Sequence, residues 1–389
     1  MRYVLWIAKE AVSQGYSVRL ATSAGFLEHP FYFTLQWECK DSVQLVVLPG
    51  KNGSRAVERL GGYKFHYYKT FAECYGQLPQ HERPDYVLIP YLDYCAHAAG
   101  LLGSPFGDAP WGGIIIGPIF HLNEMGIRAP RSRSQWVKKK LFFRLLRDKA
   151  LRRVFTLDRL LVRYMHETKP GLAKSLCFIP EPVELRGSQS RDSARRALGI
   201  PDDATVVLVY GVLDDSKGLD ALLRSMQADG FREEVSVLVA GPQNSEIRAL
   251  LASSQAKVLR DAGRIHERND FLYGEGEQEV FSASDIVWVG YRGQYISSGV
   301  LIQAATAGLP VVACDEGLIG WLTRNHELGL TVDIGDERAV ATAISELARN
   351  EELSGKFREN GRRFSMQHTV DQFSQAIGRE LLLTFPAHA

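Results

Sequence analysis

The chain has 389 residues, 45% of them hydrophobic, and its 46 basic and 45 acidic side chains leave a formal net charge of +1. This length predicts two or three domains with substantial cores. Because positive and negative charges balance, no overall electrostatic field draws the protein to nucleic acid or membranes. Five cysteines are scattered without CxxC or zinc-ligand spacing, which indicates a reduced, cytoplasmic compartment. No apolar run approaches the roughly 20 residues that span a bilayer.

The first half of the chain alternates short apolar runs with helical segments. Nearly all-apolar runs of this kind are typical of parallel strands that are covered on both faces. The chain opens on an amphipathic helix at 2–15, whereas a doubly wound domain normally opens on a strand and a Gly-rich turn. We therefore expect the first strand to be missing and interpret Met1 as an internal or misassigned start. The predicted strands are 16–22, 43–49, 85–90 and 112–118, with a helical stretch at 91–102.

A second series of strands and helices fills the other half. Two such series predict two doubly wound α/β domains, 1–185 and 186–365, joined in the polar stretch 181–190. A helix within 366–389 is expected to pack on the second domain or to return to the first. The predicted strands of this series are 205–211, 235–241, 285–291, 309–315 and 328–334, and its helices are 218–228, 244–255, 299–307, 336–348 and 351–363.

The stretch YGVLDDSKGLDALL, residues 210–223, is the first candidate binding element. Its predicted strand ends at Gly211, a polar loop follows, and Lys217 with Gly218 opens a helix. Free N–H groups and the helix dipole attract anions to a helix N-terminus, and a lysine there can reach a diphosphate. The alternative is an ordinary strand–helix turn with a solvated lysine.

The stretch YISSGVLIQAATAGLPVV, residues 295–312, is the second candidate element. Ser297 and Ser298 are favourable N-cap residues, and Gly299 lets the backbone approach a ligand closely. Gln303 lies four residues after Gly299, so its amide faces the same end of the helix and could hold a ribose or sugar hydroxyl. The alternative is a plain N-capped helix without a ligand.

Taken together, three segments resemble GT-B glycosyltransferases of the family-4, or group 1, type. The segments are GVLDDSKG, SASDIVWVGY and YISSGVLIQAATAGLPVVACDEGLIG, and their order is more specific than any one of them. The resemblance covers 205–350 and extends weakly into the first domain. It implies the GT-B fold, an α/β architecture of two doubly wound Rossmann-like domains that face each other across a cleft. It also implies an acceptor on the first domain and a nucleoside diphosphate sugar held by the second.

The chain departs from the family pattern at three donor positions. Val212 stands where the family has a loop arginine, and Tyr295 and Gln303 stand where it has two glutamates. The resemblance implies that the second carboxylate holds the nucleotide ribose and that the first lies near the donor sugar. Lys217 is retained, Arg292 could supply the lost positive charge to phosphate oxygens, and the Tyr295 phenol could bond a sugar hydroxyl.

His121 follows the predicted strand GGIIIGP at 112–118. The resemblance implies a place in the cleft beside the transferring sugar carbon, which makes His121 the candidate catalytic residue of the first domain. A neutral imidazole there could contact the sugar or the acceptor. The alternative is a loop histidine whose ring bonds the backbone. The segment PEPVEL, 180–185, resembles the interdomain segment that also lines the cleft in this family.

Between Arg128 and Arg153 the chain carries a local charge of +10. Trp136, Phe142, Leu151 and other apolar residues recur there at helical spacing. A basic amphipathic helix with aromatic flanks fits an anionic membrane surface or a lipid-linked diphosphate acceptor. The alternative is a surface helix that packs on its own domain, and nucleic acid is not favoured because no recognition motif accompanies the charge. The candidate patch comprises Lys138, Lys139, Lys140, Arg144 and Arg147.

These features predict a glycosyltransferase that moves a sugar from a nucleoside diphosphate sugar to a glycan or lipid-linked acceptor, with retention implied by the resemblance. Lys217, Arg292 and the helix N-terminus at 297–299 would stabilise the leaving diphosphate, so we expect neither a metal nor another cofactor. We expect a cytoplasmic protein, peripheral on the inner face of the membrane, that acts in cell-surface polysaccharide or glycolipid synthesis. The alternative is a non-catalytic scaffold of the same fold that binds a nucleotide sugar. An epimerase is disfavoured because the motif offers no carboxylate acid or base.

Overall fold

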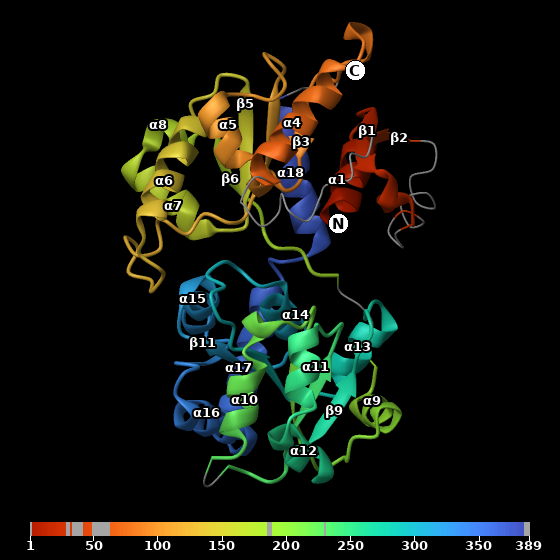
Figure 1. Cartoon of the computed structure of the whole chain (residues 1–389), viewed down its shortest axis with the longest axis vertical. Helices are drawn as coiled ribbons and strands as arrows, with labels where there is room; N and C mark the ends of the chain where they lie inside the picture. The colour runs from red at the N-terminus through yellow and green to blue at the C-terminus, as the bar shows by residue number, and fades with distance from the viewer. Residues whose placement is uncertain are drawn as a thin grey trace. The chain divides into compact units, whose positions relative to one another are not determined.

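The computed structural model describes residues 2–28, 32, 42–48, 63–184, 189–228 and 231–384 (Figure 1). It divides the chain into two units. Unit 1 comprises 1–125, 130–180 and 370–389, and unit 2 comprises 126–129 and 181–369. The chain passes from unit 1 to unit 2 after Pro180, and its last helix groups with unit 1. The predicted boundary between 185 and 186 lies outside the described residues.

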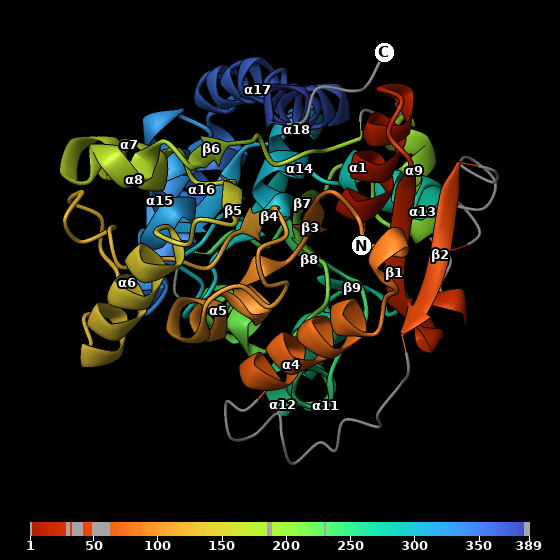
Figure 2. The ribbon, with the colours of Figure 1, turned by 90° about the horizontal axis from the view of Figure 1, so that it is seen from above.

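Unit 1 contains two parallel sheets among its described residues. Strands β1 (Val18–Ser23) and β2 (Val43–Leu48) lie side by side in one of them (Figure 2). The other has the order β3-β4-β5-β6, with β3 at Val87–Ile89, β4 at Trp111–Ile115, β5 at Leu151–Thr156 and β6 at Leu176–Phe178. Strands β1 to β4 confirm the four predicted strands. The helical interpretation was wrong at Leu151, which begins a strand whose two arginines obscured its pattern.

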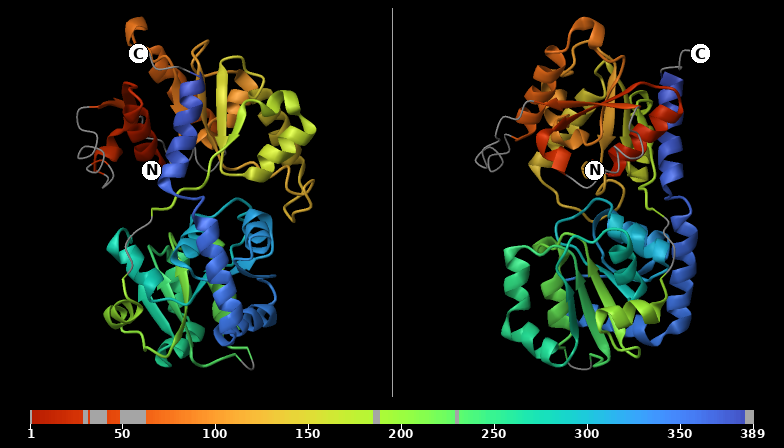
Figure 3. Two further views of the ribbon diagram at one scale, coloured as in Figure 1. Left: turned by 180° about the vertical axis from the view of Figure 1, so that it is seen from behind. Right: turned by 90° about the vertical axis from the view of Figure 1, so that its right-hand side faces the viewer.

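The helix that opens the chain, α1 (Arg2–Ser13), contacts both sheets of unit 1. Leu5 and Ala8 pack against β1 and β2, while Trp6 and Ile7 pack with residues of β4, β5 and α18. Figure 3 shows α18 beside α1. The helix predicted over 91–102 is shorter, since a 3-10 turn at Leu92–Tyr94 precedes it. The remaining helices are α4 (Tyr63–Gly76), α5 (Ala96–Leu102), α6 (Arg133–Leu145), α7 (Arg159–Thr168), α8 (Pro170–Ala173) and α18 (Val370–Thr384).

Unit 2 has a six-stranded parallel sheet with helices on both faces (Figure 3). Its strands are buried because an apolar core covers each face. The five predicted strands are confirmed, and β9 was missed because its sequence IHER is largely charged. The strands are β7 (Thr205–Tyr210), β8 (Val235–Ala240), β9 (Ile265–Arg268), β10 (Ile286–Val289), β11 (Val311–Cys314) and β12 (Gly329–Val332).

The helices of unit 2 include the five that were predicted, with additions before β7, on either side of β9, and between β11 and β12. They are α9 (Arg191–Leu198), α10 (Leu219–Ser225), α11 (Ser245–Leu251), α12 (Ser254–Asp261), α13 (Glu275–Ser282), α14 (Gly299–Ala307), α15 (Gly317–Asn325), α16 (Glu337–Arg349) and α17 (Glu351–Ser365).

The strand order of unit 2 positions a ligand site. Strand β7 lies in the middle of the order β12-β11-β10-β7-β8-β9, with β8 on one side and β10 on the other. The chain fills one side of β7 with β8 and β9 and then crosses to the other side with β10. Such a reversal is a topological switch point, and ligands of open parallel sheets bind outside the carboxyl ends of the strands that flank it. The carboxyl ends of β7 and β10 are therefore the expected ligand site.

Candidate functional site

Glycines at both ends shape the loop that follows β7. Gly211 has φ +114° and Gly218 has φ +63°, values that residues with side chains rarely adopt. A Cβ at Gly218 would collide with the carbonyl oxygen of Gly290, just beyond the end of β10. Inside the loop, Asp214 Oδ1 accepts hydrogen bonds from the amide and the hydroxyl of Ser216, at 3.0 and 2.5 Å. The loop is thereby held against the switch point.

Lys217 is half-buried in this loop. Its ammonium nitrogen lies 4.0 Å from the centroid of the Tyr291 ring, and Tyr291 is itself buried. Burial lowers the pKa of Lys217, and the charge of Asp214 opposes that shift only in part. The backbone is fixed as well, because the Lys217 carbonyl accepts a hydrogen bond from Trp288 Nε1 at 2.8 Å. An ammonium that has lost part of its hydration gains from an anionic ligand.

The first turn of α14 lies next to this loop. A Cβ at Gly211 would stand 4.0 Å from the Val300 side chain. Ser298 occupies the N-cap position, and its hydroxyl makes no capping hydrogen bond, so it takes none of the N–H groups of the first turn. The predicted second cap, Ser297, acts differently: its hydroxyl donates to Glu181 Oε2 at 2.6 Å. The structure thus places Gly211, at the start of the loop that carries Lys217, next to the first turn of α14.

Glu181 is a residue of this site that sequence analysis did not single out. It is buried, and a Cβ at Gly299 would stand 3.3 Å from its Oε1 atom. The carbonyl oxygen of Glu181 lies 3.0 Å from Nδ1 of His368, which fixes the backbone at the start of the unit 2 segment. A carboxylate beside the positive end of a helix is stabilised by the helix dipole. The only sequence signal was its place in the PEPVEL segment.

Gln303 points its amide at a carboxylate. Its Nε2 donates to Glu277 Oε1 at 2.6 Å, and the Tyr210 hydroxyl donates to the same oxygen at 2.7 Å. Glu277 lies in α13, outside the three segments that carried the family resemblance. Position 303, where sequence analysis found a carboxylate replaced by an amide, is therefore in contact with a carboxylate from another helix.

Arg292 is engaged by a carboxylate rather than presented alone. Its Nη1 and Nη2 atoms donate to the two oxygens of Asp220, at 2.5 and 2.8 Å. Burial alone would raise the pKa of Asp220, but hydrogen bonds from Arg292 and Arg224 outweigh it and lower that pKa. The interpretation of Arg292 as a substitute for the family's loop arginine stays a prediction, and it requires that this ion pair open. Val212, at the position of that arginine, is 63% exposed.

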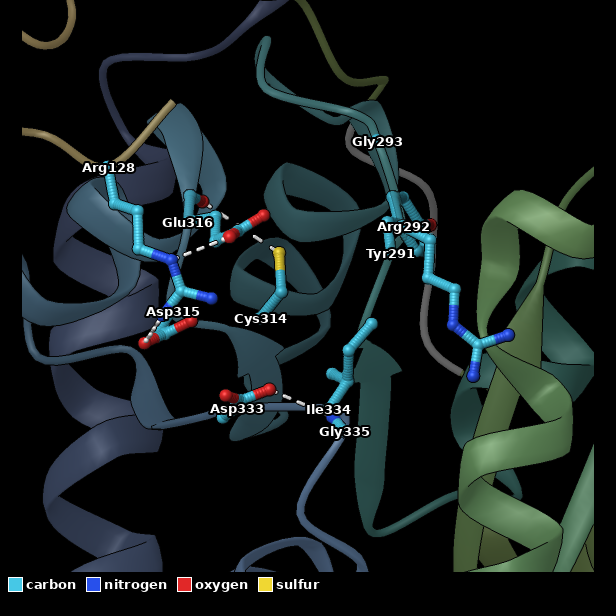
Figure 4. Close-up of a pocket in the computed structure, with 10 residues that line it drawn as sticks. All are labelled: Arg128, Tyr291, Arg292, Gly293, Cys314, Asp315, Glu316, Asp333, Ile334 and Gly335. Atoms are coloured by element: carbon cyan, nitrogen blue, oxygen red, sulfur yellow. Dashed lines mark hydrogen bonds and ion pairs between the residues drawn. The ribbon is translucent and has the colours of Figure 1, made fainter. Parts of the chain in front are cut away.

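A pocket of about 270 Å³ opens at the carboxyl ends of β10, β11 and β12 (Figure 4). Arg128 crosses its wall, with Nε 2.7 Å from Glu316 and Nη1 3.1 Å from Asp315. Tyr295 lies beside the pocket: its carbonyl accepts a hydrogen bond at 2.9 Å from the amide of Leu318, two residues after the lining residue Glu316. Burial and the neighbouring Glu316 raise the pKa of Tyr295, so the phenol stays neutral and can donate. A pocket rich in carboxylates suits hydroxyl groups better than phosphate.

His121, in unit 1, is completely buried. Its Nε2 lies 2.8 Å from Oδ2 of Asp158, and its ring packs between Phe120 and Tyr164. Asp158 is in turn fixed as the N-cap of α7, because its Oδ1 accepts from the amides of the first turn. Sequence analysis had left open a histidine whose ring bonds the backbone. In the structure the His121 ring contacts a carboxylate instead. The catalytic role of His121 stays a prediction and requires that this loop move.

The basic segment forms helix α6, capped by Ser132. Phe142 and Leu145 face the core of unit 1, while Trp136 is 59% exposed and carries the Lys140 ammonium 3.7 Å from its ring centroid. Lys139 differs from the rest of the predicted patch, because it pairs with Glu124 at 2.6 Å. Lys140, Arg144 and Arg147 are exposed, and Lys138 is half-exposed. The helix thus packs on its own unit and still presents a basic face with an exposed tryptophan.

Residues 190–364 match the family described as Glycosyl transferases group 1. Two curated relatives are D-inositol 3-phosphate glycosyltransferases. That of Saccharomonospora viridis is 32% identical over 212 residues, which are 50% of this chain and 47% of the relative. That of Rhodococcus opacus is 33% identical over 193 residues, 46% of this chain and 42% of the relative. The chain spans about half the length of the curated relatives it matches.

Two solved structures resemble nearly the whole chain. WaaG, a glycosyltransferase involved in lipopolysaccharide biosynthesis, gives a TM-score of 0.65 at 16% identity and covers 99% of this chain and 95% of its own. Anabaena Alr3699/HepE in complex with UDP and glucose gives a TM-score of 0.62 at 16% identity and covers 97% and 95%. The two α/β units and the switch-point site thus define a protein with the GT-B fold. Residues 190–364, somewhat under half of the chain, are thus similar to the group 1 glycosyltransferases.

Two searches of the described part of the chain complete the site description. No helix in the ranges given above is long and apolar enough to cross a membrane. In the same residues, no three His, Cys, Asp or Glu side chains gather as candidate metal ligands. The expectation that neither a metal nor a cofactor takes part stays a prediction.

Proposed function

We propose that the protein is a glycosyltransferase that moves a sugar from a nucleoside diphosphate sugar to a hydroxyl-bearing acceptor. The observation that carries this proposal is that the loop of Lys217, a partly desolvated ammonium, adjoins the first turn of α14 at Gly211, and that the N-cap hydroxyl of this helix makes no capping bond. Both lie at the switch point of a group 1 glycosyltransferase domain. This is the arrangement that a diphosphate requires.

The chemistry follows from where charge develops. As the bond between the sugar carbon and the diphosphate oxygen breaks, negative charge grows on the leaving diphosphate, while the acceptor oxygen forms the new bond. Fixed donors that face the growing charge lower the barrier without reorganising. Lys217 and the α14 N–H groups are such donors, and Arg292 would join them if its pair with Asp220 opened. Retention of the sugar configuration is part of the proposal and rests on the family resemblance.

The choice of donor and acceptor is supported by the relatives. HepE has been seen with UDP and with UDP-glucose, which makes a UDP-sugar the first donor to test. WaaG acts in lipopolysaccharide biosynthesis, and the curated relatives act on D-inositol 3-phosphate by their names. D-inositol 3-phosphate carries hydroxyls. We therefore propose a role in the synthesis of a cell-surface glycan or glycolipid.

A second candidate is a scaffold of the same fold that binds a nucleotide sugar without transferring it. Two observations favour it: His121 has no exposed surface, and the Arg292 guanidinium is held by Asp220. Neither feature prevents nucleotide binding, since the Lys217 ammonium and the N–H groups of the first turn of α14 take part in neither contact. Binding and turnover therefore have to be measured separately.

The test of donor binding is a thermal-shift panel of UDP-, GDP- and ADP-sugars on the full chain. We expect donors with one base to raise the melting temperature progressively as their concentration increases, because a ligand that binds the native state stabilises it. A hit is then tested for turnover. A panel without any stabilising donor would contradict both the transferase and the scaffold.

Affinity for the nucleoside diphosphate is expected to fall at alkaline pH. Burial lowers the Lys217 pKa, so the ammonium is lost at a lower pH than from an exposed lysine. Because the diphosphate favours the ammonium, affinity is full below the pKa of the free protein and declines as pH rises through it. Calorimetric titrations from neutral to about pH 10 measure this decline. Lys217→Arg, which does not titrate in that range, should give a flat profile, and an equal decline in both proteins would contradict the assignment.

We also propose that α6 attaches the protein to the anionic, cytoplasmic face of a membrane. The exposed Trp136 and its basic neighbours suit the boundary between headgroups and acyl chains. Co-sedimentation with anionic liposomes is expected at low salt and not with neutral liposomes. Charge reversal at Lys138, Lys140 and Arg144 should abolish it, while Lys139 is left in place because it pairs with Glu124. Binding that survives this reversal would contradict the proposal.

A further inference from the structure

One buried carboxylate joins three elements at the carboxyl edge of the unit 2 sheet. Glu277, in the first turn of α13, is 8% exposed. Its Oε1 atom accepts hydrogen bonds from the Tyr210 hydroxyl at 2.7 Å and from Gln303 Nε2 at 2.6 Å. Tyr210 is the last residue of β7, and Gln303 lies in α14. We call these side chains the Tyr210–Glu277–Gln303 cluster.

Burying a carboxylate in this cluster costs more free energy than filling the same space with a neutral side chain. Taking a carboxylate out of water is unfavourable, and hydrogen bonds from a phenol and an amide repay less than bonds from cations would. An amide of the same shape at position 277 would bond Tyr210 and avoid the cost of a buried charge. A charge kept at the switch point of a parallel sheet indicates a ligand that needs it.

The position of the cluster fits one part of a nucleotide. Gln303 lies four residues after Gly299, or about 6 Å along the helix from the turn that attracts the diphosphate. In a nucleotide the ribose follows directly after the first phosphate. Its two neighbouring hydroxyls are donors that a carboxylate accepts strongly. In doubly wound domains an acidic side chain near this edge of the sheet takes the ribose 2′-hydroxyl.

We propose that Glu277 is the ribose-binding carboxylate of this protein, held in place by Tyr210 and Gln303, and that the cluster selects ribonucleotides over 2′-deoxyribonucleotides. The inference rests on the proposed function, which places a nucleoside diphosphate at the switch point. Tyr210 and Gln303 act as positioning residues: their hydrogen bonds fix the Glu277 side chain before the nucleotide binds, so less rotamer freedom is lost on binding.

The test is calorimetric titration of the full chain with UDP and with 2′-deoxy-UDP. Wild type is expected to prefer UDP by about 10-fold or more, the value of one hydrogen bond to a charged group. Glu277→Gln keeps the shape, and it should weaken UDP binding by about 10-fold or more and remove the preference for the 2′-hydroxyl. Glu279→Gln is the matched control, because Glu279 lies on the same helix and pairs with Arg268 at 2.8 Å. It should bind both nucleotides as wild type does.

Exchanging the two side chains tests the positioning role of Gln303. Gln303→Glu places a second carboxylate against Glu277, and the repulsion should weaken UDP binding. The double variant Glu277→Gln with Gln303→Glu again has one carboxylate and one amide, in exchanged places. It should recover most of the affinity and of the 2′-hydroxyl preference. A double variant that binds no better than Glu277→Gln would overturn the role of Gln303.

The outcomes separate this inference from the function on which it rests. If wild type binds UDP and Glu277→Gln keeps both its affinity and its 2′-hydroxyl preference, the inference is overturned and the proposed function stands. If wild type binds none of UDP, GDP and ADP, both are overturned. Should Glu277→Gln fail to fold, Glu277→Asp takes its place with the same expected loss, because it withdraws the charge by one methylene. If Glu277→Asp then binds UDP and 2′-deoxy-UDP as wild type does, the inference is overturned.

Discussion

Replacing Lys217 by alanine is expected to weaken binding of a nucleoside diphosphate by roughly 10- to 150-fold, or about 1.5–3 kcal/mol. The loop after β7, which adjoins the first turn of α14 at Gly211, carries this ammonium, and burial against the Tyr291 ring has already partly desolvated it. The substitution keeps the fold, since the contact that fixes this loop is made by the Lys217 backbone carbonyl to Trp288. Calorimetric titration with UDP measures the loss.

Two further variants make the Lys217 experiment specific. Lys257, on α12, is an exposed lysine of the same unit, and Lys257→Ala should leave the affinity unchanged. Lys217→Arg keeps the charge and should retain more affinity than the alanine variant. Equal losses in Lys217→Ala and Lys257→Ala would mean that the effect comes from general electrostatics and not from a diphosphate at this loop.

Replacing Arg195 by alanine is expected to lower the free energy of unfolding of unit 2 by about 3–5 kcal/mol. Arg195 has no exposed surface, and its guanidinium donates to Asp285 Oδ2 at 2.6 Å and to the Ala283 carbonyl at 3.0 Å. It also bonds the carbonyls of Pro201, Asp202 and Ala204. Its removal takes one hydrogen-bond donor from each of five acceptors, the Asp285 carboxylate and four backbone carbonyls, at a site where the Arg195 side chain is buried.

The control for Arg195 lies four residues earlier on the same helix. Arg191 contacts the other oxygen of Asp285 at 3.3 Å and is 43% exposed. Arg191→Ala should cost no more than about 1 kcal/mol, because exposed ion pairs contribute little. Urea denaturation of the full chain measures both variants. A loss for Arg195→Ala within about 1 kcal/mol of the control would contradict the buried network.

The parts of the fold that sequence predicted are those with a local signal. Strands β7, β8, β10 and β11 are continuous apolar runs because helices cover both of their faces. Strands β5, β6 and β9 were missed. Strand β6 has only three residues, and charged residues interrupt the other two: Arg153 in β5 is satisfied by Glu380 of α18, and Arg268 in β9 by Glu279 of α13. In the sequence, a charged strand residue whose ion-pair partner comes from another element looks like a loop residue.

The residues of the candidate site divide in the same way, into those with a local sequence signal and those without one. Gly211, Gly218 and Gly299 were predicted from sequence because a strand end, a glycine and a helix start are local features. Their partners were missed, since Glu277 is 26 residues from Gln303 and Glu181 is 116 residues from Ser297. Only the fold brings these pairs together. The carboxylate absent from the motif at position 303 is therefore matched in space by Glu277, which comes from another part of the chain.

The measurement that tests the central claim most directly is turnover of the donor that stabilises the chain. The full protein is incubated with that nucleotide sugar, labelled in the sugar, and with cell-envelope extract as acceptor. The account predicts release of the nucleoside diphosphate together with transfer of label to the extract, both lost in Lys217→Ala. Saturating donor binding with neither release nor transfer above the protein-free background would contradict it and identify the protein as a scaffold.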